Sequence, residues 1–257
     1  MTKNILFFLS HNNQVANITL NRPNSCNAFD ITMIEQLDQY ILEITNNLNI
    51  KLLVITANGK HFSAGADLNW MKNSINYTKE QNLQDAKKLS SLLFNLYYLN
   101  KLVICGIQGN VYGGAIGIAA CADLIIAADN CNFCFSEVKF GLAPAIISQF
   151  IFNAMDQNFA KYHMLTAKPF NIQQAANAYF IDSVTSLNNL SNTISNNIEY
   201  LLSLNFEGIL ATKKLLNHTL APISKEHLNT GVQLTADLRT GTISQQLINL
   251  FLKKHQN

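Results

Sequence analysis

Two stretches of small residues stand out in this sequence because their backbone could carry out chemistry. The stretch 109–123 reads GNVYGGAIGIAACAD and places four glycines within nine residues. It contains no Asp, Glu, His, Lys, Arg, Ser or Thr before Asp123. The stretch 61–68 reads HFSAGADL and is also rich in small residues. Glycine and alanine let the backbone approach a ligand closely, so the reactive groups here would be backbone N–H groups.

A glycine pair that leads into a helix directs unpaired N–H groups and the positive end of the helix dipole at whatever lies in front of it. Such a site suits an anion, which could be a phosphate or an oxyanion that forms during a reaction. The phosphate is disfavoured because the glycines match neither GxGxxG nor GxxxxGK[ST]. An oxyanion requires two converging N–H groups, and each stretch could supply one.

Glu137 is the residue that could move a proton. It lies among the apolar side chains of Phe133, Phe135, Val138 and Phe140. A carboxyl group in apolar surroundings has a raised pKa, which a general acid or base that works near neutral pH requires. The sequence leaves open the alternative that Glu137 lies at the edge of the fold with a hydrated carboxylate.

The elements around these residues follow an α/β pattern. Apolar, β-branched runs predict parallel strands that are buried on both faces, over 52–56, 102–106 and 124–127. Apolar residues spaced three and four apart predict helices from Asp30 to about Asn49 and over 79–99, after an N-terminal hairpin. Each small-residue stretch begins just after a buried strand. Both should therefore open at the same edge of a sheet and face one ligand.

Helical patterns replace the strands beyond about Gln149. They predict helices over 172–179, 190–204, 206–216 and 224–254. We expect an α/β core over residues 1–195 and a helical region over 196–257. That region is too thin to form a core by itself, so it should pack on the α/β core and on neighbouring subunits.

Composition argues against several classes of protein. Charged residues make up 13% of the chain and the net charge of +2 is spread along it, so no nucleic-acid partner is indicated. No apolar run is long enough to span a membrane, and the N-terminal run is too short for a signal peptide. The five cysteines show no CxxC motif and are expected to be reduced thiols. We expect a cytoplasmic protein without a metal site, a redox cofactor or a membrane partner.

Taken together, these motifs resemble the enoyl-CoA hydratase/isomerase family, also called the crotonase superfamily. The segments that carry the resemblance cover most of the chain and lie at 21–23, 27–28, 62–68, 109–114, 121–123, 136–144 and 250–254. Within the family, FSAGADLNWM and SEVKFGLAPAIIS are most similar to bacterial methylglutaconyl-CoA hydratases. The resemblance implies a crotonase-like spiral of ββα units with a helical C-terminal trimerisation region, assembled as a homotrimer or hexamer.

The resemblance also implies roles for individual residues. The backbone N–H groups of Ala66 and Gly114 would form an oxyanion hole for a thioester carbonyl, with Glu137 as the catalytic acid and base. The other residues implied to contact an acyl-CoA substrate are Ala64, Asp67, Leu68, Asn69, Gly113, Gly117, Phe251 and Lys254. Coenzyme A is part of that substrate, so no separate cofactor is expected. Asp67 and Asp123 are also interpreted as caps of turns or helices.

One position departs from the usual pattern of hydratases, which carry two catalytic glutamates. The first aligns with Gly117, so Glu137 is left alone, as in the family's Δ3,Δ2-enoyl-CoA isomerases. We favour a hydratase that acts on 3-methylglutaconyl-CoA or a related enoyl-CoA in leucine, isoprenoid or fatty-acid catabolism. An isomerase and a non-catalytic binding module are the alternatives. The second carboxylate of a methylglutaconyl group would require a cation, for which Lys139, Lys87 and Lys88 are candidates.

Overall fold

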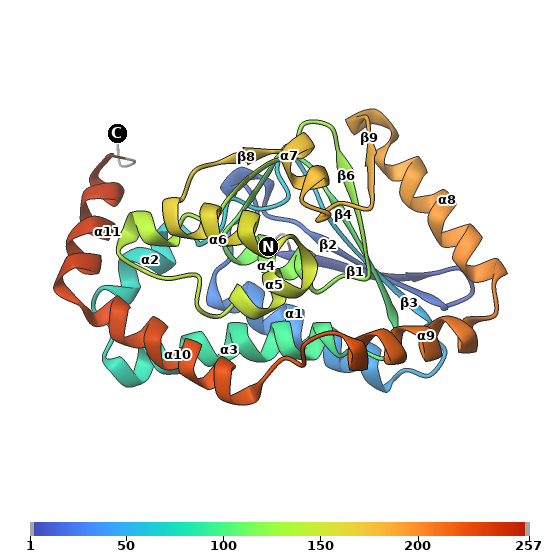
Figure 1. Cartoon of the computed structure of the whole chain (residues 1–257), viewed down its shortest axis with the longest axis horizontal. Helices are drawn as coiled ribbons and strands as arrows, with labels where there is room; N and C mark the ends of the chain where they lie inside the picture. The colour runs from blue at the N-terminus through green and yellow to red at the C-terminus, as the bar shows by residue number, and fades with distance from the viewer. Residues whose placement is uncertain (1–2, 255–257) are drawn as a thin grey trace.

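The computed structural model describes residues 3–254 and is built around a six-stranded sheet (Figure 1). The strands lie in the order β1, β2, β3, β4, β6, β9. Their bounds are β1 Ile5–Ser10, β2 Val15–Leu20, β3 Leu52–Ala57, β4 Leu102–Ile107, β6 Leu124–Ala128 and β9 Ser183–Thr185. β1 and β2 form the predicted antiparallel hairpin, and every later pair is parallel. The three predicted buried strands are neighbours at the centre, and every residue of β4 is buried.

A second, smaller sheet carries the residues of chemical interest and was not predicted. It consists of β5 (Asn110–Tyr112), β7 (Asn132–Cys134) and β8 (Phe170–Asn171). Strands of two or three residues are too short to show the alternation by which a strand is predicted. β5 leads directly into Gly113, and β7 ends three residues before Glu137.

Helices cover the sheets, and some of them begin at capping residues that are visible in the sequence. Their bounds are α1 Ile31–Asn46, α2 Leu68–Ser74, α3 Lys79–Tyr97, α4 Gly114–Ala120, α5 Ser148–Ala154, α6 Gln157–Thr166, α7 Ile172–Asn177, α8 Leu190–Ser203, α9 Phe206–Thr219, α10 Lys225–Thr240 and α11 Thr242–Lys254. Asp30 caps α1 by accepting from the Met33 N–H (2.8 Å). Thr78 and Gln81 form a capping box at the start of α3.

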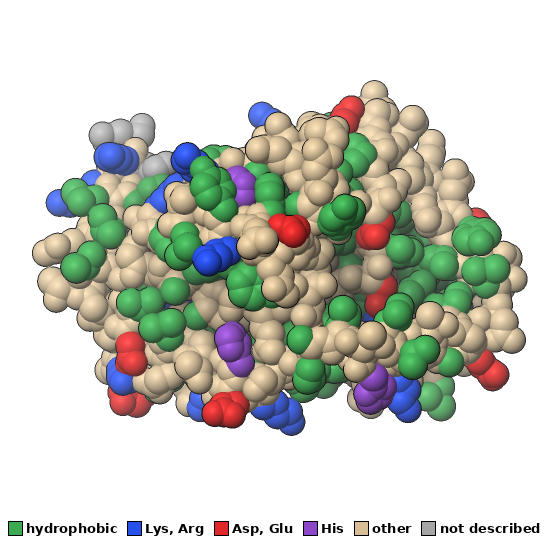
Figure 2. All heavy atoms as spheres, viewed as in Figure 1, with side chains coloured by type: hydrophobic (Ala, Val, Ile, Leu, Met, Phe, Trp, Pro, Cys, Tyr) green, Lys and Arg blue, Asp and Glu red, His purple; other side chains and the backbone are tan. Residues whose placement is uncertain are grey.

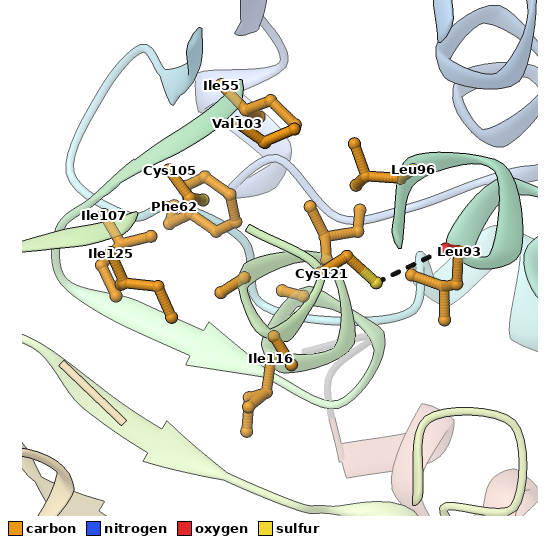
Figure 3. Packing of buried hydrophobic residues seen from close by; sticks show 14 of the residues in the cluster. Ile55, Phe62, Leu93, Leu96, Val103, Cys105, Ile107, Ile116, Cys121 and Ile125 are labelled. Atoms are coloured by element: carbon orange, nitrogen blue, oxygen red, sulfur yellow. Dashed lines mark hydrogen bonds between the residues drawn. The ribbon is translucent and has the colours of Figure 1, made fainter. Parts of the chain in front are cut away.

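The apolar core is continuous from the central strands to the C-terminal helices. α1 buries the face predicted from its spacing, which includes Leu37 and Ile41. Figure 3 shows the packing at α4, where the Cys121 thiol donates to the Leu93 carbonyl (3.5 Å). Phe206 of α9 and Val232 of α10 belong to the same cluster of buried residues as β3 and β4. The division into units at residue 195 stays a prediction.

The C-terminal helices return to the region of the small-residue stretches. The single helix predicted over 224–254 is wrong: Gly241 separates α10 from α11 with extended backbone (φ −70°, ψ 140°). α10 runs along α3, while α11 contacts α2 and η2, a 3-10 turn at Glu137–Phe140 (Figure 1). This break lets α11 lie across the segment that contains Glu137.

Surface charge and cysteine chemistry agree with the composition of the chain. On the face shown in Figure 2, acidic and basic side chains are scattered rather than gathered. All five cysteines are free thiols, and burial raises the pKa of Cys131 to about 12. Within residues 3–254, no helix combines the length and hydropathy that crossing a membrane requires.

Candidate active site

Both small-residue stretches open into one cavity of about 800 Å³. Its walls include Ala66, Gly114 and Glu137. The prediction that the two stretches face one common site is therefore confirmed, although the glycine pair follows β5 of the second sheet. Ala64, Asp67, Leu68, Asn69, Gly113 and Phe251 also line the cavity.

The loop 61–67 is held by backbone hydrogen bonds on both sides of Ala66. The Phe29 N–H donates to the Gly65 carbonyl (2.7 Å), and the Asp67 N–H donates to the Phe29 carbonyl (2.9 Å). The Gly65 N–H donates to the Ser63 hydroxyl (3.2 Å), and Gly65 has a φ of +94°, which favours glycine. The Ala66 N–H between them has no acceptor within residues 3–254. It is therefore available to a ligand in the cavity.

Asp67 fixes the end of this loop by capping α2, as predicted. Its carboxylate accepts from the N–H groups of Asn69 (2.8 Å) and Trp70 (3.2 Å). The Arg22 guanidinium also pairs with it, at 2.8 Å. Because these contacts occupy the carboxylate, we interpret Asp67 as a residue that positions Ala66.

Asp123 has a structural role of a different kind. It accepts from the Val103 N–H of β4 and pairs with Lys213 of α9, both at 2.7 Å. It is not part of the cavity wall. Its carboxylate joins α9 to the central sheet rather than capping a helix.

The glycine pair that precedes α4 places a second N–H in the cavity. Gly113 has φ +53° and ψ −123°, a conformation that side chains disfavour, and its N–H donates to the Cys134 carbonyl (3.0 Å). A Cβ on Gly113 would lie 3.3 Å from Oε1 of Glu137. Gly114 is the first residue of α4, and the described chain offers its N–H no acceptor. A helix N-terminus and a carboxyl group therefore meet at the same point of the cavity.

The carboxyl group of Glu137 is withdrawn from water. Its Oε2 atom is buried and has no hydrogen-bonding partner within residues 3–254. The adjacent Phe133 and Phe135 are fully buried. Burial raises the pKa of Glu137 to about 7, because the low-dielectric surroundings disfavour the charged form. The prediction of a raised pKa is confirmed, and the alternative of a hydrated surface carboxylate is wrong.

Gly117 lies in α4 behind the cavity wall. A Cβ at this position would lie 2.5 Å from Cγ2 of Ile147 and 3.4 Å from Cδ1 of Leu93. Ile147 lines the cavity and Gly117 does not. The space in which a first glutamate would begin is therefore filled by an aliphatic side chain. Lys254, at the exposed end of α11, also lies outside the cavity wall.

Arg239 is a cavity residue that sequence reasoning missed. It comes from α10, and its guanidinium carbon lies 5.0 Å from the centre of the Trp70 ring. The two residues are 169 positions apart in the sequence. They come together because α10 packs near α2 in the folded chain. The one feature of the sequence that could have singled out Arg239 is its composition, because Arg22 and Arg239 are the only arginines; the local pattern around Arg239 gave no such indication.

The lysines considered as partners of a second carboxylate lie elsewhere or are exposed. Lys139 lines the cavity but is exposed, with Nζ 3.5 Å from the Cys134 sulfur. Lys87 and Lys88 do not line it, and Lys88 pairs with Glu35 (2.7 Å).

The arrangement can stabilise negative charge on an oxygen while a proton moves nearby. Two unpaired N–H groups face the cavity from separate loops, and a carboxyl group with a pKa near neutrality lies beside one of them. Removing one such donor typically lowers a rate by roughly 10²–10³-fold. Within residues 3–254, no three His, Cys, Asp or Glu side chains are grouped so that they could hold a metal ion.

Comparisons with known proteins agree with this chemistry. A family model described as "Enoyl-CoA hydratase/isomerase" matches residues 10–256. The solved structure of an enoyl-CoA hydratase from Shewanella pealeana is 35% identical, with a TM-score of 0.80, and the match covers 98% of this chain and 94% of that one.

Two relatives of different activity are also similar to the chain. A short-chain-enoyl-CoA hydratase from Clostridium acetobutylicum is 29% identical over 236 residues, which are 89% of this chain and 83% of that protein. A trans-2-decenoyl-[acyl-carrier-protein] isomerase from Streptococcus mutans is 38% identical over 133 residues, which are 51% of each. The chain spans about half the length of several curated relatives that it matches.

Proposed function

The chain belongs to the enoyl-CoA hydratase/isomerase family, and from this premise we propose that it adds water to the double bond of an α,β-unsaturated acyl-CoA thioester, or removes water in the reverse direction. The observation that carries the proposal is the position of the Glu137 carboxyl group beside Gly113 and Gly114, at the N-terminus of α4. A relative with a hydratase activity in its name covers most of the chain.

In the proposed reaction, the N–H groups of Ala66 and Gly114 donate to the thioester carbonyl oxygen. This withdraws electrons from the double bond and stabilises the enolate that forms when the water oxygen bonds to the β carbon. Glu137 takes a proton from that water and returns a proton to the α carbon. The carboxyl group ends the cycle in its starting state, and a pKa of about 7 suits both transfers.

A single carboxyl group can serve both steps because it has two oxygens. Oε1 lies toward Gly113 and the cavity, while Oε2 is buried and has no partner in the described chain. This proposal does not need a second glutamate at position 117, where Ile147 fills the space.

We further propose 3-methylglutaconyl-CoA, or a closely related enoyl-CoA, as the substrate. The support is the similarity of 62–71 and 136–148 to methylglutaconyl-CoA hydratases, and both segments contribute to the cavity wall. Coenzyme A would enter as part of the substrate. Assembly as a trimer or hexamer and a cytoplasmic location stay predictions.

The second candidate is isomerisation of a 3-enoyl-CoA to a 2-enoyl-CoA. One observation favours it: the cavity has Glu137 but no carboxylate at position 117, and an isomerase needs only one group to move a proton between two carbons. A partial relative is named as an isomerase. Glu137 and both N–H groups would serve this reaction without change.

The test is to incubate the purified protein separately with crotonyl-CoA, 3-methylglutaconyl-CoA and a 3-enoyl-CoA, and to identify the products by mass and chromatography. We expect a gain of one water with the first two substrates. An isomer of unchanged mass from the 3-enoyl-CoA alone would support the second candidate. No turnover of any substrate would refute both and leave a non-catalytic binding module.

Two variants separate chemistry from binding. Glu137→Gln should abolish turnover while it still binds CoA thioesters, because the amide fills the same space but cannot accept the proton. Glu43→Gln changes an exposed glutamate of α1 in the same way and is the matched control. Wild-type activity in Glu137→Gln would show that another group transfers the proton.

A further inference from the structure

Arg239 is a charged side chain in the cavity that the proposed reaction does not use. Its Nη1 atom is buried and has no hydrogen-bonding partner within residues 3–254. Leaving a buried charged donor without a partner is costly, so such groups are usually paired. The unpartnered nitrogen therefore indicates a missing acceptor.

Arg239 lies over an aromatic ring but has no direct counter-ion within residues 3–254. The guanidinium lies over the face of Trp70, whose Nε1–H donates to Oδ2 of Asp85 at 2.9 Å. No carboxylate of the described chain lies within ion-pair distance of Arg239. Burial lowers the pKa of Arg239 and the nearby Asp85 counteracts this, so the side chain keeps its charge.

Arg239 lines a buried part of the cavity wall. The wall also includes the exposed residues Asn24 and Ser25, where a large polar group could remain in solvent. The wall around Arg239 is formed by buried residues of α2, α10 and α11, namely Trp70, Met71, Thr235 and Ile248. A thioester whose polar CoA group stays at the exposed part of this wall can extend its acyl chain toward the buried part, which includes Arg239.

We propose that Arg239 binds a carboxylate at the far end of the acyl chain, so that the substrates are CoA monothioesters of unsaturated dicarboxylic acids. The inference rests on the proposed function, because it assigns the acyl end of the same cavity. It replaces the lysine candidates: Lys139 is exposed, whereas the donor of Arg239 is buried and unpartnered. Arginine also matches a carboxylate in geometry, since its planar group offers two parallel donors.

The proposal is tested by binding rather than by turnover. Glutaryl-CoA and pentanoyl-CoA have five-carbon acyl chains without a double bond, and only the first carries a terminal carboxylate. Calorimetric titration of wild-type protein should show tighter binding of glutaryl-CoA by roughly 10–100-fold, as expected for a buried charged hydrogen bond. Equal affinity for the two thioesters would overturn the inference.

Variants show which cation is responsible for the preference. Arg239→Met should remove it, and Arg239→Lys should restore part of it. Lys139→Met and Lys214→Met, which remove exposed positive charges inside and outside the cavity wall, should keep it. Loss of the preference in Lys139→Met, or its retention in folded Arg239→Met, would contradict the assignment. If Arg239→Met fails to fold, Arg239→Lys and the two wild-type titrations decide the question.

Failure of this inference can be told apart from failure of the proposed function. If the protein hydrates crotonyl-CoA but binds the two saturated thioesters with equal affinity, the proposed function stands and the role of Arg239 is refuted. If it binds glutaryl-CoA more tightly but converts no enoyl-CoA, the role of Arg239 stands and the proposed function is refuted.

Discussion

The buried carboxyl group of Glu137 should cost the protein stability above neutral pH. Burial raises its pKa from 4.5 to about 7 in the folded chain. A carboxyl group whose pKa is higher in the folded state contributes stability that is complete below pH 4.5 and is lost as the pH rises through 7. Replacing Glu137 by glutamine removes this titration, and the amide is of nearly the same size.

The magnitude follows from the same pKa. Linkage between 4.5 and about 7 gives a total loss of about 3 kcal/mol. Most of this loss, roughly 2–3 kcal/mol, falls between about pH 5 and about pH 8. The quantity to compare is the free energy of unfolding of Glu137→Gln minus that of wild type. This difference should be larger at about pH 8 than at about pH 5, by roughly 2–3 kcal/mol. In a chain of this length the difference corresponds to roughly 5–10 °C in Tm.

Urea unfolding followed by circular dichroism, at both pH values, measures this difference. Any effect of the amide that does not depend on pH cancels in the comparison. Glu43→Gln, at an exposed position of α1, should show no such pH-dependent gain. The reasoning is refuted if Glu137→Gln and wild type differ by the same free energy at both pH values, because Glu137 then ionises equally in the folded and unfolded chain.

Four further predictions concern the geometry and titration of the site. Gly113→Ala should lower kcat/KM roughly 10²-fold or more, because a side chain disfavours φ +53° and its Cβ would lie 3.3 Å from Oε1 of Glu137; steady-state kinetics on the folded variant measure this. Gly117→Ala should destabilise the fold by about 1–3 kcal/mol because its Cβ would meet Ile147, and Ile147→Ala should relieve part of that cost in a double-mutant cycle of unfolding free energies. Asp67→Ala should cost about 1–2 kcal/mol through loss of the α2 cap and should also lower kcat, since the cap positions Ala66; a variant with full activity would separate the cap from the site. In the dehydration direction, which requires ionised Glu137 as base, kcat/KM should rise with pH and level off above about 7; a flat profile would contradict the pKa.

The sequence sufficed for five strands of the main sheet and for the reactive groups, because these depend on local patterns. The edge strand β9, with three residues, was not predicted. β3, β4 and β6 are short apolar runs rich in β-branched residues, as is typical of buried strands, and the glycine pair predicted an open helix N-terminus. The apolar neighbours of Glu137 predicted its raised pKa correctly. In each case the residues that decide the outcome lie within a few positions of one another.

What the sequence did not predict depends on contacts between distant segments. The second sheet consists of strands of at most three residues, which are stabilised by pairing rather than by propensity. The apolar pattern continues through Gly241, so the sequence did not predict that the chain breaks there and that α11 contacts α2. Arg239 had no local signal because its partner Trp70 belongs to another helix.

The most direct test of the role of Glu137 is hydration of crotonyl-CoA in D₂O, with the product analysed by mass spectrometry and proton NMR. The wild-type protein should form a water adduct with one deuterium on the α carbon, because the proton that Glu137 returns comes from solvent. Glu137→Gln should form no adduct under the same conditions. Adduct formation by Glu137→Gln at the wild-type rate would contradict the central claim that this carboxyl group, beside the N–H groups of Ala66 and Gly114, carries the proton.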